Sequence, residues 1–382
     1  MKLLIGPAAE NEMFFNRPIL QSQFLRKMDQ SKHVSIAAAR RIGKTSFMKN
    51  LATQSIGKYD FHYLITESIN NSNKFFEKLY KVLLNQISND KKVKEYIEDL
   101  FKKLDIKKIG ITEIEFGKTD INFFEELSLL IQKLKTPKTI VLLIDEYSQT
   151  LQNIIEEQGE KTAKLFLHQC RELRVMQTAE TKVHFVFAGS IGLENLVANL
   201  NESKTIADLA NFEVPPFTET ETKEFFIQIL DTDPYHFPIE EQEYFIQKLR
   251  WLLPYYIQVI MGEIETILKN EKKNIIERDL IDRAFDIAIL NRTYFSHWKQ
   301  RLKSIFKGKE HQSAIELLDF TSTQAILTRY DIQDIYKKFE VDPSNEIINI
   351  FIHDGYLSKI EAHKYRFNSP LLENWWKQNL DN

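Results

Sequence analysis

The chain has little cysteine, glycine and proline, and it lacks any long apolar run. A single cysteine, Cys170, excludes an internal disulfide and a metal cluster built from several thiolates. Only 11 glycines and 10 prolines occur in 382 residues, so turn signals are sparse and helices should predominate. No run approaches the roughly 18 apolar residues of a membrane helix, and the opening residues lack the apolar length of a signal peptide. We therefore expect a cytoplasmic protein with no membrane partner.

An excess of charge of one sign is also missing. The sequence holds 51 basic and 54 acidic residues, a formal net charge of -3. This balance gives no global attraction to nucleic acid or to an anionic membrane, although a local basic patch is compatible with it. The hydrophobic share of 43% and the charged share of 27% are those of a globular protein. A chain of this length is too long for one hydrophobic core and predicts two or three domains.

In the first half of the chain, short apolar runs alternate with amphipathic helical patterns. The run "TIVLLI" is nearly continuous in Val, Ile and Leu, which is typical of a parallel strand buried on both faces. The alternation predicts an α/β fold with a parallel sheet and helices on both sides. Residues 106–121 interrupt the rhythm and predict a short extended hairpin. The runs expected to form the sheet are residues 34–38, 61–65, 139–144, 183–188 and 212–215.

After Pro216 the patterns become helical almost to the end of the chain. The last segment has the order helix, helix, helix and strand pair, an order typical of a winged helix. We therefore predict a core at residues 1–215, a helical domain at residues 216–307 and a winged-helix-like domain at residues 308–382.

The segment "AARRIGKTS", residues 38–46, fits a phosphate-binding loop between a strand and a helix. Gly43 lets the backbone approach the phosphates, and the helix that begins there adds its positive end. Lys44 should reach the β- and γ-phosphates, and the Thr45 hydroxyl should coordinate Mg²⁺. Ala38 replaces the first glycine of the motif by one methyl group, which we expect the loop to tolerate. The expected nucleotide-binding residues of the loop are Ala39, Arg40, Arg41, Ile42, Gly43, Lys44, Thr45 and Ser46.

A P-loop predicts an acidic partner at the end of a second strand, and one lies about 100 residues further on. The segment "TIVLLIDEYSQ" delivers Asp145 and Glu146 at the carboxyl end of a buried strand. Asp145 is the expected Mg²⁺ partner, and Glu146 is the expected base that orients and activates the attacking water. Acidic residues at strand-to-helix turns also cap helices, which is the alternative interpretation. The joint presence of the loop and the acidic pair favours the nucleotide site.

A third strand ends in "FAGSIGLENL" and places Ser190 at its carboxyl edge. Ligands of open α/β sheets bind beyond the carboxyl ends of the strands, so Ser190 is the candidate catalytic sensor of the γ-phosphate. The alternative is a turn of small residues that caps the following helix.

The succession of segments resembles the archaeal-type P-loop ATPases, which are relatives of the AAA+ and STAND groups. The resemblance spans nearly the whole chain. It implies an AAA+-like parallel sheet with flanking helices, followed by an α-helical lid and a C-terminal winged-helix domain, and it implies ATP as the nucleotide. The segments that carry it are "FFNRPIL", "AAARRIGKTSF", "LLIDEYSQTL", "FVFAGSIGLENLV", "FEVPPFTETETKEFF", "PYYIQVI" and "FSHWKQRL".

The resemblance also implies roles for residues outside the core motifs. Arg17 matches an arginine that lies near the nucleotide base in the family, with a solvated turn arginine as the alternative. Arg40 and Arg41 match paired basic residues of the family's loop that could supplement Lys44, with simple surface charge as the alternative. Tyr255 and Tyr256 match the start of the lid helix, where a core aromatic pair is the favoured interpretation.

Two arginines in "FLHQCRELRVMQT", Arg171 and Arg174, precede the sensor strand. In an oligomer, an arginine here could reach the γ-phosphate of a neighbouring subunit. An arginine on the polar face of the helix is the favoured alternative.

Three functional hypotheses follow. The first is a Mg²⁺-dependent ATPase that acts as a nucleotide-driven switch and contacts a protein partner, or a second copy, through its lid and winged helix. The second is a DNA-binding ATPase of the initiator or transposition-helper type, with contacts from Lys359, Lys364 and Arg366. The candidate recognition helix "SNEIINIFIHDGYL" has no Lys or Arg, so DNA is not the favoured partner. The third is a scaffold that holds ATP without hydrolysing it.

Overall fold

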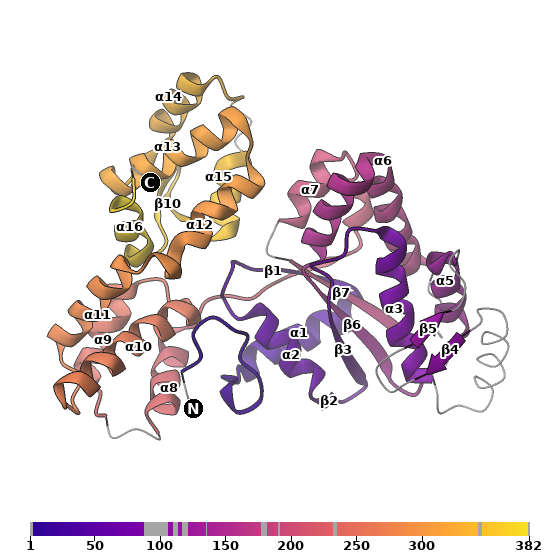
Figure 1. Ribbon diagram of the computed structural model, residues 1–382, viewed down its shortest axis with the longest axis horizontal. Helices are drawn as coiled ribbons and strands as arrows, with labels where there is room; N and C mark the ends of the chain where they lie inside the picture. The colour runs from indigo at the N-terminus through magenta and orange to yellow at the C-terminus, as the bar shows by residue number, and fades with distance from the viewer. Residues whose placement is uncertain are drawn as a thin grey trace. The chain divides into compact units, whose positions relative to one another are not determined.

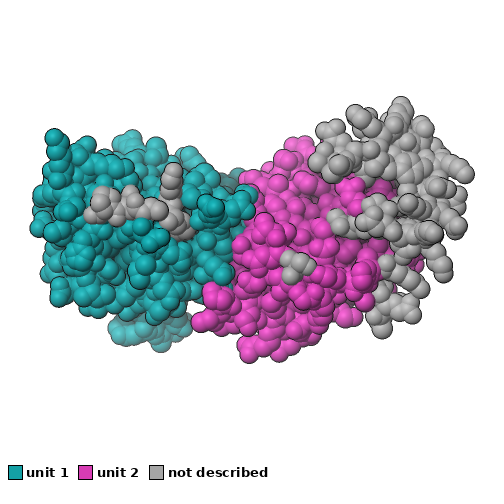
Figure 2. All heavy atoms as spheres, turned by 90° about the horizontal axis from the view of Figure 1, so that it is seen from below, with its two compact units in different colours: residues 1–17, 38–46, 214–382 teal, residues 18–37, 47–213 magenta. Residues whose placement is uncertain are grey.

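The computed structural model describes residues 3–87, 106–109, 114–116, 121–134, 136–176, 182–189, 192–231, 235–342 and 346–380. The chain divides into two compact units, drawn in two colours in Figure 2. The sheet unit comprises residues 18–37 and 47–213, and the helical unit comprises residues 1–17, 38–46 and 214–382. The division into three domains at residues 215 and 307 stays a prediction.

The sheet unit is built on a six-stranded sheet in the order β2-β3-β6-β7-β1-β8, in which only β2 is antiparallel to its neighbour (Figure 1). The predicted parallel α/β sheet is therefore confirmed. The two-residue edge strand β2 was not predicted, because so short a strand leaves no apolar run in the sequence. The strands are β1 (Val34–Ala37), β2 (Ser55–Ile56), β3 (Tyr59–Ile65), β6 (Thr139–Asp145), β7 (Val183–Gly189) and β8 (Ala210–Glu213).

Helices cover both faces of this sheet (Figure 1). On one face, Phe24 of α1 packs on Phe47 of α2 and on Phe212 of β8, with ring centroids 5.5 and 5.2 Å apart. On the other face, Tyr147 of α6 lies 4.4 Å from Phe187 of β7. The helices of the sheet unit are α1 (Pro18–Ser31), α2 (Lys44–Ala52, from Phe47 onward), α3 (Ser72–Ile87), α5 (Phe123–Lys133), α6 (Tyr147–Val175) and α7 (Leu193–Asn199), with a 3-10 turn, η2 (Ser203–Ile206).

The strand β6 is buried on both faces, as its apolar run predicted. Residues 140–144 are each no more than 2% exposed. The predicted interruption is confirmed as an antiparallel pair, β4 (Ile106–Ile109) and β5 (Ile114–Phe116), which forms a sheet of its own. Burial on both faces thus places β6 inside the sheet. Asp145 is the last residue of this strand and lies at its carboxyl end.

The helical unit follows the order that the sequence predicted, helices first and a strand pair near the end. A short strand, β9, adds to this pair and gives a three-stranded antiparallel sheet, β10-β11-β9. The winged-helix interpretation of this order stays a prediction. The elements are η1 (Asn11–Met13), α8 (Glu219–Leu230), α9 (Ile239–Leu249), α10 (Pro254–Glu271), α11 (Arg278–Leu290), α12 (Arg292–Ile305), α13 (Gly308–Gln324), β9 (Leu327–Thr328), α14 (Arg329–Phe339), α15 (Glu346–Asp354), β10 (Leu357–Glu361), β11 (Lys364–Phe367) and α16 (Pro370–Lys377).

One aromatic cluster joins the predicted lid to the C-terminal residues. Trp298 of α12 lies 4.6 Å from Tyr356 and 6.4 Å from Trp251, and Trp376 of α16 lies 6.3 Å from Tyr356. Trp375 completes the set of four tryptophans, and its ring centroid lies 5.5 Å from that of Phe295. Tyr256 of α10 lies 5.9 Å from Trp251 and 5.6 Å from Phe295. Because aromatic side chains bury large areas, α10, α12 and α16 share one core, and tryptophan fluorescence reports on that core alone.

A buried ion pair reinforces the same junction. Arg301 of α12 donates from Nε to Asp354 Oδ2 of α15 at 3.0 Å, and the two side chains are only 4% and 5% exposed. His353 lies 3.1 Å from the second carboxylate oxygen of Asp354. A buried charge without its partner is strongly unfavourable, so the pair holds α15 against α12.

Asp354→Asn should therefore lower the free energy of unfolding by about 3–5 kcal/mol, because it leaves the Arg301 guanidinium buried beside a neutral amide. Urea unfolding followed by tryptophan fluorescence measures the change. Glu361→Gln is the control, because its pair with Lys364 is exposed and should contribute less than about 1 kcal/mol. Equal, small losses in the two variants would show that the buried pair adds nothing.

Candidate nucleotide site

The predicted strand–loop–helix is present at residues 34–52. The strand β1 ends at Ala37, and α2 begins at Lys44, where the sequence predicted the helix start. Gly43 has φ +97, in the left-handed region that favours glycine. A Cβ added at Gly43 would meet nothing within 4 Å, so glycine is needed here for its backbone conformation and not for space. Lys44, the first residue of the helix, is only 7% exposed.

Within the loop, Arg41 contacts one side chain and one main-chain carbonyl of the helical unit. Its φ of 62 is uncommon for a non-glycine residue. The guanidinium carbon lies 3.9 Å from the ring centroid of Tyr255, and Nη1 donates to the Tyr294 carbonyl at 3.5 Å. Arg41 is therefore not simple surface charge. At the end of the loop, the Ser46 hydroxyl accepts a hydrogen bond from the Ala9 N–H at 2.9 Å.

The acidic pair lies at the carboxyl end of β6. Asp145 is 1% exposed; its Oδ1 accepts from the Glu146 N–H at 3.0 Å and its Oδ2 from the Tyr63 hydroxyl at 3.1 Å. The Asp145 carbonyl accepts from the Thr66 N–H at 3.0 Å and from the Thr66 hydroxyl at 2.9 Å. Bonds to both the side chain and the main chain thus fix the orientation of this carboxylate.

Tyr63 and Thr66 were not predicted as site residues. Both lie at the end of β3, which pairs in parallel with β6 so that Ile65 is opposite Asp145. The only signal in the sequence was their place at the end of a strand expected to join the sheet. The order of the strands, which decides that β3 neighbours β6, is not written in any local pattern.

The helix-capping interpretation of Asp145 and Glu146 is wrong for Glu146. Glu146 precedes α6, yet its side chain makes no capping hydrogen bond. Its backbone is left-handed, with φ 58 and ψ 33, a conformation that costs of order 1–3 kcal/mol in a non-glycine residue. Such strain persists where the surroundings impose it, and it gathers at functional sites.

The strand register brings the carboxyl end of β1, after which the loop begins, and the acidic pair to the same end of the sheet. In the parallel pairs, Ala37 is opposite Gly189, and Ile144 is opposite Phe187. One further step along β6 therefore takes Asp145 to within one residue of the level at which β1 ends. The two strands are separated only by β7, a distance of about 10 Å.

At the same end of the sheet, the close approach of α6 explains why β7 ends in a glycine. A Cβ at Gly189 would lie 2.0 Å from the Ser148 hydroxyl oxygen, so only glycine lets the first turn of α6 approach β7 this closely. The predicted sensor, Ser190, is the next residue and lies outside the residues that the structure describes.

Solved structures are similar in fold to nearly the whole chain. The chain is similar to the Walker-type ATPase of Pyrococcus abyssi, with a TM-score of 0.62, 14% identity, and coverage of 99% of this chain and 100% of that one. It is also similar to the ORC2 protein of Aeropyrum pernix, solved in ADPNP–ADP complexes, with a TM-score of 0.54, 11% identity, and coverage of 96% and 93%. No protein family and no curated protein matches the sequence.

The chain therefore shares the fold of these two structures. The resemblance to archaeal-type P-loop ATPases is thus confirmed as a likeness of fold. The strand β1, which leads into the predicted loop, lies between β7 and β8 and is not an edge strand of the sheet.

Arg17 lies in a buried site, and its predicted position near the nucleotide base stays a prediction. Arg17 is 7% exposed, so it is not a solvated turn arginine. Its Nε and Nη2 donate to the carboxylate of Glu221 at 2.8 and 3.0 Å, and Nη1 donates to the Pro215 carbonyl at 2.8 Å. Nη2 also donates to the Pro216 carbonyl at 3.1 Å, and the guanidinium lies over Phe217. Arg17 therefore ties the N-terminal segment to the start of α8.

The favoured interpretation placed Arg174 on the polar face of its helix, and this interpretation is wrong. Arg174 is 4% exposed and donates from Nε to Asp208 at 2.6 Å and from Nη1 to the Cys170 carbonyl at 3.1 Å. Its Nη2 bonds to Thr205 and Asp208. These bonds hold η2 against α6 and commit the guanidinium to its own subunit. Burial raises the pKa of the neighbouring Cys170 thiol to about 12, so the cysteine serves as a small apolar residue.

Tyr255 and Tyr256 form the core aromatic pair that the sequence favoured. They are 6% and 0% exposed, and their ring centroids are 6.0 Å apart. Burial raises the pKa of both phenols. Tyr256 thus belongs to the core, whereas Tyr255 also presents its ring to Arg41 of the loop.

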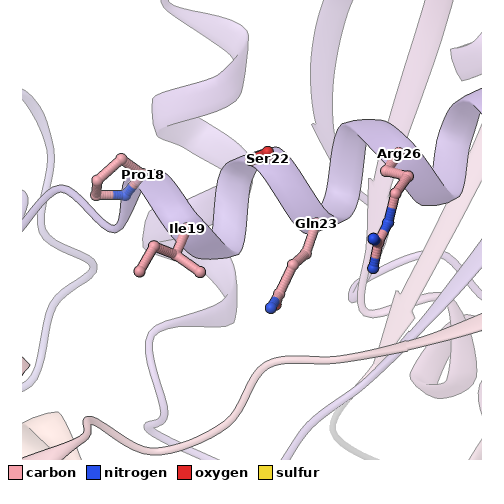
Figure 3. A pocket seen from close by; sticks show the side chains of 5 residues that line it. All are labelled: Pro18, Ile19, Ser22, Gln23 and Arg26. Atoms are coloured by element: carbon pink, nitrogen blue, oxygen red, sulfur yellow. The ribbon is translucent and has the colours of Figure 1, made fainter.

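A separate hollow of about 330 Å³ lies on the outer face of α1, lined by Pro18, Ile19, Ser22, Gln23 and Arg26 (Figure 3). All five residues come from one helix, and none belongs to the predicted site. Among the described residues, no helix has the length and apolar character needed to cross a bilayer, and no group of three or more His, Cys, Asp or Glu side chains could hold a metal ion.

Proposed function

We propose that the chain binds ATP with Mg²⁺ at residues 38–46 and hydrolyses it as a nucleotide-driven switch. The observation that carries the proposal is that β1 and β6 end at nearly the same level of the sheet. The strand β1 leads into the loop that contains Gly43, with its left-handed backbone, and β6 leads into Asp145 and Glu146. The similar structures add support, because one is a Walker-type ATPase and the other was solved with ADPNP and ADP.

The loop residues have distinct roles in binding. The left-handed backbone at Gly43 turns successive N–H groups toward the phosphate oxygens, and the first turn of α2 adds its positive end. Lys44 pairs with the β- and γ-phosphates as a compact charge. The Thr45 hydroxyl and the Asp145 carboxylate are hard oxygen donors of the kind that Mg²⁺ prefers. When bound, Mg²⁺ neutralises charge on the β- and γ-phosphate oxygens.

Glu146 serves as the base. Its carboxylate accepts a proton from a water molecule while the water oxygen bonds to the γ-phosphorus, and the bond from that phosphorus to the bridging oxygen of ADP breaks. The bond from the Glu146 N–H to Asp145 links this residue to the metal ligand. We also propose Ser190 as the γ-phosphate sensor, only because it follows the strand β7 in the sequence.

The surface charges favour a protein partner over DNA for the C-terminal residues. Lys364 pairs with Glu361 at 2.9 Å, and Lys338 pairs with Glu316 at 2.7 Å. DNA binding draws its affinity from lysines and arginines that displace counterions from phosphates, and neighbouring carboxylates oppose that. We therefore propose that the lid and the C-terminal residues contact a protein, or a second copy of the chain.

One experiment separates the three functional hypotheses: phosphate release from ATP with and without duplex DNA, together with the molecular mass in each nucleotide state. We expect slow, Mg²⁺-dependent release that duplex leaves unchanged. Stimulation by duplex, with binding that weakens steeply as salt rises, would support the DNA-binding ATPase instead. Stoichiometric binding of ATP with no phosphate released over hours would identify a scaffold. The absence of any ATP binding would refute the proposed nucleotide site.

A further inference from the structure

The contact of Arg41 with Tyr255 joins the nucleotide loop to the helix α10. Arg41 and Tyr255 are far apart in sequence, yet the guanidinium carbon lies 3.9 Å from the ring centroid, well inside the roughly 6 Å range of a cation–π contact. The Tyr294 carbonyl of α12 accepts from the same guanidinium. The loop arginine therefore takes its orientation from two helices of the predicted lid.

The surface that receives Arg41 is itself fixed. The Tyr255 hydroxyl donates to the Tyr294 carbonyl at 3.4 Å, and the Tyr294 hydroxyl donates to Glu263 Oε1 at 2.9 Å. Tyr255 is 6% exposed and packs at 6.4 Å against the ring of His297. Because these contacts hold the Tyr255 ring in one orientation, the ring offers a single face to Arg41. The guanidinium that stacks on this face therefore has one preferred plane.

The two aromatic neighbours of Arg41 are uncharged. Burial, with the positive charges of Arg41 and Arg40, lowers the pKa of His297 to about 3, so this imidazole is neutral at physiological pH. Burial raises the pKa of Tyr255 against the opposing effect of Arg41, so its phenol is neutral as well. Neither aromatic neighbour adds a second charge next to the guanidinium.

We infer that Tyr255 is a positioning residue, which acts through Arg41 to direct the loop guanidinium toward the phosphates of the bound nucleotide. Stacking engages the face of a guanidinium, whereas its N–H donors lie in the plane and match phosphate oxygens. The inference rests on the proposed function and adds to it a direct link between nucleotide affinity and α10. A nucleotide that engages Arg41 would thereby act on the core that holds all four tryptophans.

A double-mutant cycle on the full chain tests this role, with the affinity for Mg-ATP measured by isothermal titration. Tyr255→Leu should weaken binding about three- to tenfold, the size of a partly buried cation–π contact. Tyr255→Phe keeps the ring and should stay within about twofold of the wild type. Arg41→Ala should lose at least as much as Tyr255→Leu, and the double variant should be no weaker than Arg41→Ala alone, because the tyrosine then has nothing to orient.

Tyr244→Leu is the matched control. It removes another cation–π contact of the helical unit, in which the Arg278 guanidinium lies 4.4 Å from the Tyr244 ring, and it should leave ATP affinity unchanged. Tyr255→Met, which fills the space with a flexible side chain, replaces Tyr255→Leu if circular dichroism shows that the leucine variant is unfolded.

The outcomes distinguish this inference from the proposed function. If the wild type binds ATP and Tyr255→Leu binds it equally well, the positioning role is wrong and the site stands. Losses that add in the double variant would also overturn it, because they would show that Tyr255 acts independently of Arg41. If the wild type binds no ATP, the proposed function and this inference are both wrong.

Discussion

Lys44→Ala should weaken ATP binding by roughly a hundredfold or more, because it removes the charged hydrogen bonds to two phosphates. Lys44 is the first residue of α2 and is buried to 7% exposure, so its ammonium has a fixed place at the helix start. Alanine is the best helix former, and α2 should therefore persist in the variant. Equilibrium titration with Mg-ATP measures the loss, and circular dichroism checks the helix content.

Lys58→Ala is the control for this variant. Lys58 lies between β2 and β3, its side chain is 65% exposed, and its pair with Asp29 is on the surface. The control changes the net charge by the same amount as Lys44→Ala, and it should leave ATP affinity within about twofold. Equal affinities of the wild type and Lys44→Ala would refute the assignment of the loop as the nucleotide site.

Glu146→Gln should keep ATP bound while phosphate release falls by about 10²- to 10⁴-fold, the usual contribution of a general base. The amide has nearly the shape of the carboxylate but cannot accept the proton of the attacking water. The Glu146 N–H that bonds to Asp145 belongs to the main chain, so the substitution should leave that bond intact. A single-turnover assay with saturating ATP separates the chemical step from binding.

Glu156→Gln on the same helix, α6, provides the matched control. Its carboxylate is exposed and accepts a hydrogen bond from the Gln152 amide, so hydrolysis should be unchanged. Loss of ATP affinity in Glu146→Gln would indicate a structural role for the residue. Hydrolysis at the wild-type rate would exclude Glu146 as the base.

Some elements of this site could be predicted because their signals are local. The start of α2 follows from the position of Gly43, which alone tolerates the left-handed backbone without strain. The strand β6 follows from an apolar run that can be buried only inside a sheet. The placement of Asp145 at the end of that strand then required no knowledge of any distant residue.

Other elements could not be predicted, because they depend on residues far away in the chain. Arg17 bonds to Glu221 across 204 positions of sequence, and Arg41 bonds to Tyr294 across 253. A long arginine side chain fits a solvated turn, a nucleotide site or a buried pair equally well when only its neighbours in sequence are known. The solvated-turn interpretation of Arg17 and the polar-face interpretation of Arg174 failed for this reason.

The sequence by itself determined the sheet, the loop and the acidic pair, because backbone conformation and apolar burial are set by a few consecutive residues. Only the tertiary structure decided what each buried or half-buried charge contacts: Asp145 with Tyr63, Arg301 with Asp354, and Arg41 with Tyr255. A charge taken out of water needs a partner nearby, and the partner is chosen by the packing of strands and helices and not by the order of residues along the chain.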